Sequence, residues 1–289
     1  MRVMRMAPHH HHGPHYPPPR PWLLTVVLLV ILPQLVDSTA CSSDVMAYYN
    51  AGVHPLTGGV WKDIGPLAKD GAVVGSVAAG TGGGGHVAFS GGSVNTGLTM
   101  GDINAKTGAF SVAAWFQYTG TDTQTYSAIF GSRDPSGNDD WFVGKDNGNT
   151  MMGVQDGNYI NNLVTAPGVF DAAGRASAHS VVWTRSAGAG SKTAKVYIDG
   201  VLKGTGSFTG ANNAEELHVG KEYGGAFGFS GKMWQVLILS TELSAAQAAS
   251  LHSTFNSGQP YCGVSTSSVP FSLPATCLTH PTDVSKTCT

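Results

Sequence analysis

The chain has 289 residues, of which 12% are charged and 39 are glycine, and its formal net charge is −2. This near-neutral balance offers no basic stripe that could neutralise phosphates, which argues against nucleic-acid binding. The glycines follow no Gly-X-Y period, so the chain is not collagen-like, and the composition is typical of a turn-rich β protein.

The N-terminus carries a secretion signal. Arg20 precedes an apolar run from Trp22 to Val36, and the small residues Ser38-Thr39-Ala40 follow it. We expect residues 1–40 to be a signal peptide with a Pro/His-rich leader, cleaved after Ala40, and the mature protein to be secreted. Because the run is shorter than the ~20 residues that span a bilayer, a retained anchor is only the alternative, and no stable membrane span is expected after cleavage.

Residues 41–256 form the predicted folded domain. Short apolar or aromatic runs alternate with Gly, Asn and Asp clusters from about Asp44 to Phe255, as in a many-stranded β-sandwich. β-Branched and aromatic residues dominate the predicted strands. These strands are Phe110–Tyr118, Tyr126–Ser132, Trp141–Lys145, Thr150–Gln155, His179–Arg185, Lys195–Ile198, Leu217–Val219 and Met233–Leu239.

Two local signals are sharper than the rest. Asp199-Gly200 follows one strand and precedes Val201, which predicts a type I′ hairpin. Ser244 can cap a helix that runs through Leu251 to Phe255, with Gln247 at the capping-box position. The helix would close the domain.

The tail, residues 257–289, is rich in Ser, Thr and Pro and has little periodicity. An even cysteine count in a secreted chain suggests two disulfides, for which the sequence allows three pairings. All four cysteines lie outside the predicted β-rich body, so the bonds would tie down its ends and the tail. They are Cys41, Cys262, Cys277 and Cys288.

Several segments together resemble the laminin-G-like domains of the concanavalin A-like lectin/glucanase superfamily, over about 210 residues. The sequence Trp61-Lys62-Asp63-Ile64-Gly65 with Asp70-Gly71 looks like the family's opening motif, and Phe110-Ser111-Val112-Ala113-Ala114-Trp115 resembles its core strand. Lys195-Val196-Tyr197-Ile198-Asp199-Gly200-Val201 is similar to its hairpin, and Phe229-Ser230-Gly231-Lys232 to its closing segment. The resemblance implies an all-β jelly-roll sandwich of two antiparallel sheets. One strand departs from the pattern, because Ala178 stands where the family usually has Trp.

The resemblance also raises the question of glycan hydrolysis, which in related glucanases uses two carboxylates about 5 to 5.5 Å apart. The nearest equivalent here is the pair Glu216 and Glu222, with His218 between them. On a regular strand these glutamates would stand ~20 Å apart, too far to act on one glycosidic bond. We therefore expect a binding module and no enzyme, with His179 and His218 as structural histidines.

The loops could hold a ligand site. In related domains calcium often lies at the loop rim, and oxygen-bearing loop residues could supply it here; these same residues are also what β-turns require, so both interpretations stand. The candidate calcium ligands are Asp134, Asn138, Asp139, Asp140 and Asp156. Trp141, Tyr159 and Tyr223 are the rings expected to stack on a sugar, since they lie by these loops.

Trp61, Trp115, Trp183 and Trp234 lie within predicted strands and are expected to pack in the core instead. The resulting prediction is a secreted, non-catalytic, lectin-like module that binds an extracellular glycan or glycoprotein. The alternatives are a protein-binding or structural module and a divergent glycan hydrolase.

Overall fold

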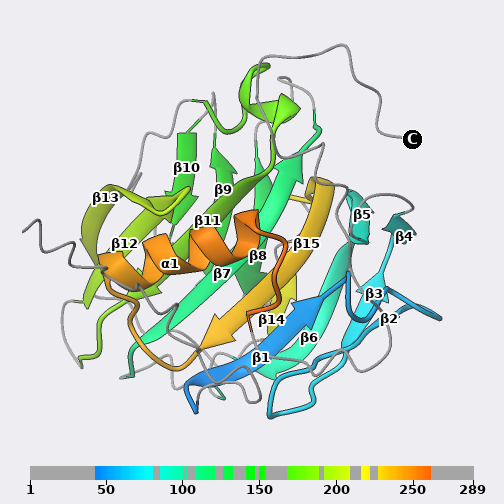
Figure 1. The fold of residues 1–289 in the computed structure, drawn as a ribbon, viewed down its shortest axis with the longest axis horizontal. Coiled ribbons are helices and arrows are strands. Elements are labelled where there is room, and N and C mark those ends of the chain that lie inside the picture. The colour runs from blue at the N-terminus through cyan, green and yellow to red at the C-terminus, as the bar shows by residue number, and fades with distance from the viewer. Residues whose placement is uncertain are drawn as a thin grey trace, which may run out of the picture. The chain divides into compact units, whose positions relative to one another are not determined.

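The predicted strands assemble into two antiparallel sheets that face each other, with one short helix outside them (Figure 1). The structure is a computed structural model and describes residues 43–80, 85–99, 102, 108–120, 126–132, 141–146, 150–153, 168–188, 192–208, 216–221 and 227–261. These residues belong to one compact unit, Asp37–Thr289. The prediction of an all-β jelly-roll sandwich is confirmed.

Each sheet collects strands that are distant in sequence. Sheet A has the order β13 (Val201–Phe208), β12 (Lys192–Ile198), β11 (His179–Arg185), β7 (Phe110–Tyr118), β15 (Ser230–Leu239), β5 (His86–Ser90) and β4 (Val77–Gly80), and β1 (Val45–Asn50) also pairs with β15. Sheet B has the order β10 (Thr150–Gly153), β9 (Trp141–Asp146), β8 (Ser127–Ser132), β14 (Glu216–Val219), β6 (Ser93–Thr99), β3 (Gly71–Val74) and β2 (Val60–Trp61). A short 3-10 helix, Gly174–Ala176, precedes β11.

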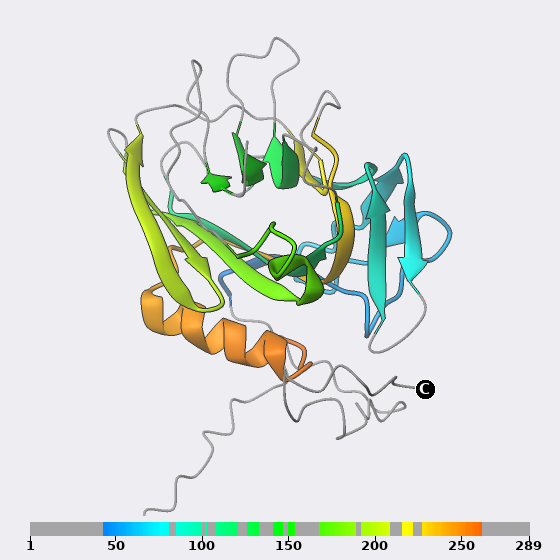
Figure 2. The ribbon, with the colours of Figure 1, turned by 90° about the horizontal axis from the view of Figure 1, so that it is seen from above.

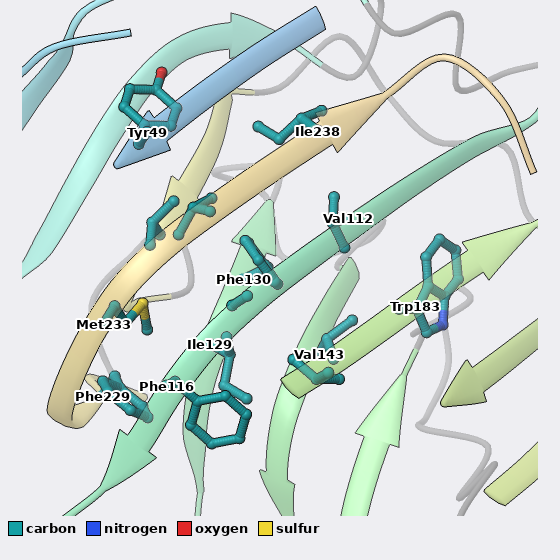
Figure 3. Close-up of a cluster of buried hydrophobic side chains, with 14 of the residues drawn as sticks. Tyr49, Val112, Phe116, Ile129, Phe130, Val143, Trp183, Phe229, Met233 and Ile238 are labelled. Carbon is teal, nitrogen blue, oxygen red and sulfur yellow. The ribbon is translucent and has the colours of Figure 1, made fainter. Parts of the chain in front are cut away.

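The core lies between the two sheets and follows from the alternation of side chains along each strand. In β7, Val112, Ala114 and Phe116 point into the sandwich, whereas Ala113 and Trp115 point to the outer face of sheet A. The inward residues of both sheets are fully or almost fully buried. Figure 3 shows part of this core, with Val112, Phe116, Trp183, Met233 and Ile238 from sheet A and Ile129, Phe130 and Val143 from sheet B.

A second apolar cluster lies on the outer face of sheet A, beneath helix α1 (Ala245–Asn256), which Figure 2 shows on the side of sheet A away from sheet B. Ala248, Leu251 and Phe255 are the buried residues of the helix. Ser244 accepts a hydrogen bond from the Gln247 backbone N–H, and the Gln247 side chain accepts one from the Ser244 backbone N–H. This capping box confirms the predicted helix start.

The opening motif has a structural role in this chain. Asp63 is buried and accepts backbone hydrogen bonds from Tyr48 (2.8 Å), Gly65 (2.7 Å) and Lys69 (2.8 Å). Burial raises the pKa of its carboxyl group, although the three N–H groups act in the opposite direction. At Gly65 a Cβ atom would come within 2.9 Å of the Ala47 Cα atom. The motif therefore ties the loop after β2 to β1.

The hairpin at Asp199-Gly200 is also confirmed. Both residues have positive φ, 51° and 75°, as a type I′ turn requires. Of the other predicted strands, Phe110–Tyr118 and His179–Arg185 match the observed bounds, while β12 and β15 begin three residues before the predicted starts. Strands β2 to β6 were not predicted from the sequence. These strands are short or glycine-containing, which weakens the alternating pattern.

A side chain added at Gly200 would show how closely the β12–β13 hairpin packs against α1. A Cβ atom there would lie 2.9 Å from the Ala249 Cα atom of α1, in addition to adopting a positive φ. We expect Gly200→Ala to lower the free energy of unfolding by more than about 1 kcal/mol, measured by urea denaturation. Gly91→Ala is the matched control, because Gly91 has φ 82° and no atom within 4 Å of its added Cβ. Equal losses in the two variants would contradict close packing of α1 on the hairpin.

Candidate functional site

Nearly all of the predicted site residues lie outside the described part of the chain. Trp141 begins β9 and its backbone pairs with Ser132, but its side chain is outside the described atoms. The calcium, stacking and disulfide predictions therefore stay predictions. The other residues outside the described part are Tyr159, Tyr223, Asp134, Asn138, Asp139, Asp140, Asp156, Cys41, Cys262, Cys277 and Cys288.

Described aromatic side chains gather instead on the outer face of sheet A. Trp61 and Trp183 are fully buried, which confirms their predicted place in the core. Trp115 packs against the second apolar cluster, under α1, and not between the two sheets. For Trp234 the prediction of core packing is wrong, because it is only partly buried and its ring meets that of Trp115 outside the sandwich, with centroids 6.5 Å apart. The reason is strand parity, since the inward positions next to them are filled by Phe116 and Met233.

These rings form a row across neighbouring strands and the helix. The centroid of the His86 ring on β5 lies 5.8 Å from that of Trp234 on β15. On the other side, the Trp115 ring on β7 lies 6.1 Å from the His252 ring and 6.3 Å from the Phe255 ring, both on α1. We call His86, Trp115, Trp234 and His252 the aromatic platform. All four residues are half-buried, and the side chain of His252 is 27% exposed.

A β-bulge places Trp234 in this row. Met233 is the register partner of Phe116 and Gln235 that of Trp115, which leaves Trp234 as an extra residue between two paired positions. Bulges re-aim side chains in this way. Trp234 and Gln235 consequently both lie on the outer side, where Gln235 accepts a hydrogen bond from the Tyr48 hydroxyl (2.5 Å) and donates to the Gln259 carbonyl (3.1 Å).

Polar groups border the platform. Lys232 on β15 lies between its register partners Gln117 on β7 and Ala88 on β5. Burial lowers the pKa of His86, and the charge of Lys232 lowers it further. His86 is therefore neutral at neutral pH, and the ammonium group of Lys232 supplies the positive charge on this part of the face.

A hydrogen-bonded cluster lies behind His252, where the hairpin turn, β11 and α1 meet. Asp199 accepts hydrogen bonds from His179 Nδ1 (2.8 Å) and from the Ser180 backbone N–H (2.9 Å). His252 Nδ1 lies 2.9 Å from Ser180 Oγ and 3.8 Å from Asp199 Oδ1. The residue types match a catalytic triad, but the serine and the carboxylate approach the same imidazole nitrogen and Ser180 is 1% exposed. The cluster therefore cannot relay a proton from an accessible nucleophile.

The surroundings of His179 favour its charged form. Its Nδ1 atom faces the Asp199 carboxylate, and its Nε2 atom lies 3.1 Å from the Gly174 carbonyl, so both nitrogens meet acceptors. Burial lowers the pKa of His179, but the hydrogen bond and charge of Asp199 and the carbonyl of Gly174 outweigh it and raise the pKa. The prediction of a structural histidine agrees with these contacts.

Sheet B carries β14, the strand whose sequence comes nearest to a glucanase motif but was expected to be non-catalytic. Glu216 accepts a hydrogen bond from the Asn95 side chain, and His218, with Asn95 and Gly131 as register partners, is 7% exposed. Burial lowers the pKa of His218. Glu242, the other described glutamate, forms an ion pair with Lys195 (2.6 Å), a residue of sheet A. The two described glutamates thus belong to different parts of the sandwich.

In the part of the chain that the structure describes, no three His, Cys, Asp or Glu side chains are grouped so as to hold a metal ion. No helix among the described residues is both long enough and apolar enough to cross a membrane.

Comparison with known families agrees with this architecture. Residues 84–249, more than half of the chain, match the laminin G sequence profile of the concanavalin A-like lectin/glucanases superfamily. The chain therefore belongs to this superfamily, as the motif resemblance indicated. A comparison with curated protein sequences found no match.

Solved structures with the same fold come from different proteins. The chain is similar to domain 4 of AbnA, a GH43 extracellular arabinanase from Geobacillus stearothermophilus, in complex with arabinotriose (TM-score 0.52, 19% identity, covering 72% of this chain and 98% of that domain). It also resembles the Trypanosoma rangeli sialidase in complex with sialic acid (TM-score 0.56, 14% identity, 76% and 34%). A third is the binding domain of botulinum neurotoxin DC in complex with SialylT (TM-score 0.55, 18% identity, 75% and 52%). The chain spans about a third of the sialidase and half of the toxin domain, and these identities establish the shared fold alone.

The aromatic platform was missed by sequence reasoning, although part of its signal was present. In Phe110–Tyr118, Trp115 occupies an odd position whereas Phe110, Phe116 and Tyr118 occupy even ones, so parity alone separates it from the core rings. The outward position of Trp234 was harder to find, because the bulge beside it is set by register against β7 and has no local sequence signature.

The His179–Asp199 contact predicts a pH-dependent stability. Because the pKa of His179 is raised in the folded protein, the charged imidazole stabilises the fold. This contribution to the free energy of unfolding is fully present below the ordinary histidine pKa of about 6.5 and is lost as the pH rises through the raised pKa. Burial acts to raise the pKa of Asp199, but the hydrogen bonds from His179 and Ser180 lower it overall, so its contribution is lost only in acid, as pH falls through the lowered value. We expect His179→Gln to cost roughly 1 kcal/mol more at about pH 5.5 than at about pH 8.5, measured by urea denaturation.

His54→Gln is the control for this experiment, since His54 is exposed. Its effect should be small and the same at both pH values. If His179→Gln showed the same small cost at both pH values, the charged form of His179 would not contribute to stability.

Proposed function

We propose that this protein is a secreted, non-catalytic module that binds carbohydrate, and that the aromatic platform is its sugar-binding surface. The observation that carries the proposal is the pair of half-buried indoles, Trp115 and Trp234, on the outer face of sheet A. Polar groups of His86, Gln117 and Lys232 border them.

The chemistry of this surface suits a sugar. The face of a pyranose ring presents C–H groups that pack against an indole, while its rim presents hydroxyls that need hydrogen-bond partners. The platform supplies an indole surface at Trp234, a ring nitrogen at His86 and an ammonium group at Lys232. Ala78 and Ala88, which are register partners on β4 and β5, add only methyl groups to the outer face, so a flat ligand meets little steric hindrance there.

The structural neighbours give independent support. An arabinanase domain with arabinotriose, a sialidase with sialic acid and a toxin binding domain with SialylT share the fold. Their sequences are too distant to transfer a ligand, but they show that this sandwich is used repeatedly where carbohydrate is handled.

The placement of the glutamates supports a non-catalytic module. Retaining or inverting hydrolysis needs two carboxyl groups within about 10 Å on either side of the scissile bond. Among the described residues, Glu216 is held by Asn95 on sheet B and Glu242 by Lys195 on sheet A. Neither has a second glutamate beside it in the described part of the chain, which favours binding without turnover.

Trp234→Ala tests the proposed surface. The variant removes the Trp234 ring. Among the described aromatic residues, this ring contacts His86 and Trp115 alone. We expect the affinity for glycans selected on a glycan array to fall roughly fivefold to tenfold, because a stacked ring contributes about 1 to 1.4 kcal/mol. Trp234→Phe should recover part of the affinity.

Leu202→Ala is the matched control, since Leu202 is a large apolar side chain that is 47% exposed on the β12–β13 hairpin. It should bind like the wild type. Selective glycan binding that survives Trp234→Ala would move the site to the loops after β8 to β10. A blank array for the wild type would instead favour a protein-binding or structural role.

Calcium at the loop rim remains part of the proposal and has its own test. If Asp134, Asp139 and Asp140 bind calcium, millimolar calcium should raise the melting temperature, because a ligand that binds only the native state stabilises it. Asp139→Asn should reduce this shift. No shift in the wild type would remove calcium from the proposal while leaving the aromatic platform unaffected.

A further inference from the structure

The platform differs from a purely apolar surface because a positive charge borders it beside Trp234. Lys232 is half-buried between β7 and β5, two residues before Trp234. Within the described residues its ammonium group has no ion-pair partner, whereas Lys62 pairs with Asp70 and Lys195 with Glu242. A half-buried cation on a surface of rings is favourable when an anion binds beside it.

The remaining charged groups nearby do not neutralise this cation. Asp199 lies behind His252, where it accepts hydrogen bonds from His179 and from the Ser180 backbone. His86 is on the near side, and its lowered pKa reflects burial together with the charge of Lys232, with no carboxylate contributing. Among the described residues, therefore, the side of the platform around Trp234 is positive at neutral pH.

We propose that the platform binds a sugar residue that carries a carboxylate, with its ring against Trp234 and its carboxylate at the Nζ atom of Lys232. This inference rests on the proposed carbohydrate-binding function and names the class of sugar. Nonulosonic acids such as sialic acid and hexuronic acids share this chemistry.

The spacing of the two side chains fits such a ligand. Residues two apart in a strand lie about 7 Å apart and point to the same face. A carboxylate is attached at the edge of a pyranose ring, so a ring centred on Trp234 places its acidic group toward Lys232. The flexible stem of lysine can pack along the sheet while its charged end reaches the anion.

The test compares acidic sugars with their uncharged equivalents on the full-length protein. The array should hold sialylated oligosaccharides beside the same oligosaccharides without sialic acid, and hexuronic-acid oligosaccharides beside their methyl esters. We expect one of the two acidic series to bind roughly tenfold or more tightly than its uncharged partner. Which series responds identifies the source of the carboxylate.

Lys232→Gln then tests the residue. By titration calorimetry it should lose this acidic preference while keeping the weaker affinity for the uncharged partner, and Lys232→Arg should retain the preference. Lys203→Gln is the control, because it makes the same change of charge at an exposed position of β13. Melting temperatures of all variants show that the fold is intact.

The outcomes separate this inference from the proposed function. Trp234-dependent binding that is equal for acids and esters, or unchanged in Lys232→Gln, overturns the acidic-sugar inference and leaves carbohydrate binding in place. An array blank for every sugar overturns both. Acid-selective binding lost equally in Lys232→Gln and Lys203→Gln would show a general effect of net charge and would also overturn the role of Lys232.

Discussion

The two central strands of sheet A, β7 and β15, must bury both of their faces, and the rest of the structure depends on this constraint. Their inward side chains, among them Phe116 and Met233, pack against sheet B. Their outward side chains, Ala113 and Leu237, are equally apolar and need a second cover. Helix α1 supplies it with Leu251 and Phe255, so the molecule has three layers at its centre although the fold is a two-sheet sandwich.

The helix covers only part of the sheet. The capping box at Ser244 fixes where α1 begins, and the close approach of Gly200 to Ala249 fixes how near the helix lies to the β12–β13 hairpin. It ends at Asn256, shortly after Phe255 contacts Trp115. The next ring on the sheet, Trp234, therefore lies beyond the helix cover, and the platform is where the outer apolar layer stops.

How much of this could be predicted from the sequence depends on how local each signal is. The strand Phe110–Tyr118, the turn at Asp199-Gly200 and the cap at Ser244 were predicted because their signals are contained within a few residues. The opening motif was recognised from the sequence. Only the structure shows that the Asp63 carboxylate accepts hydrogen bonds from the backbone N–H groups of three residues.

The candidate site was less predictable because it depends on which residues from distant strands become neighbours. Both faces of β7 are apolar, so the apolar context of Trp115 did not distinguish the space between the sheets from the cluster under α1, and only its parity relative to Phe116 does. His86 and Trp234 are separated by almost 150 residues and meet only through the pairing of β5 with β15. The predicted loop residues were chosen for their chemistry, which sequence does show, whereas their convergence is a three-dimensional property.

The two tryptophans of the platform have different roles. Trp115 belongs to the core-strand motif that resembles the family, and its ring contacts His252 and Phe255 of α1 on one side and Trp234 on the other. Within the platform, Trp115 is therefore the ring that connects the side chains of α1 with Trp234. Trp234 lies outside the recognised motifs and contacts only His86 and Trp115 among the described rings. Because a shared fold does not determine a ligand, specificity must come from particular side chains, and Trp234 lies outside the motifs that resemble the family.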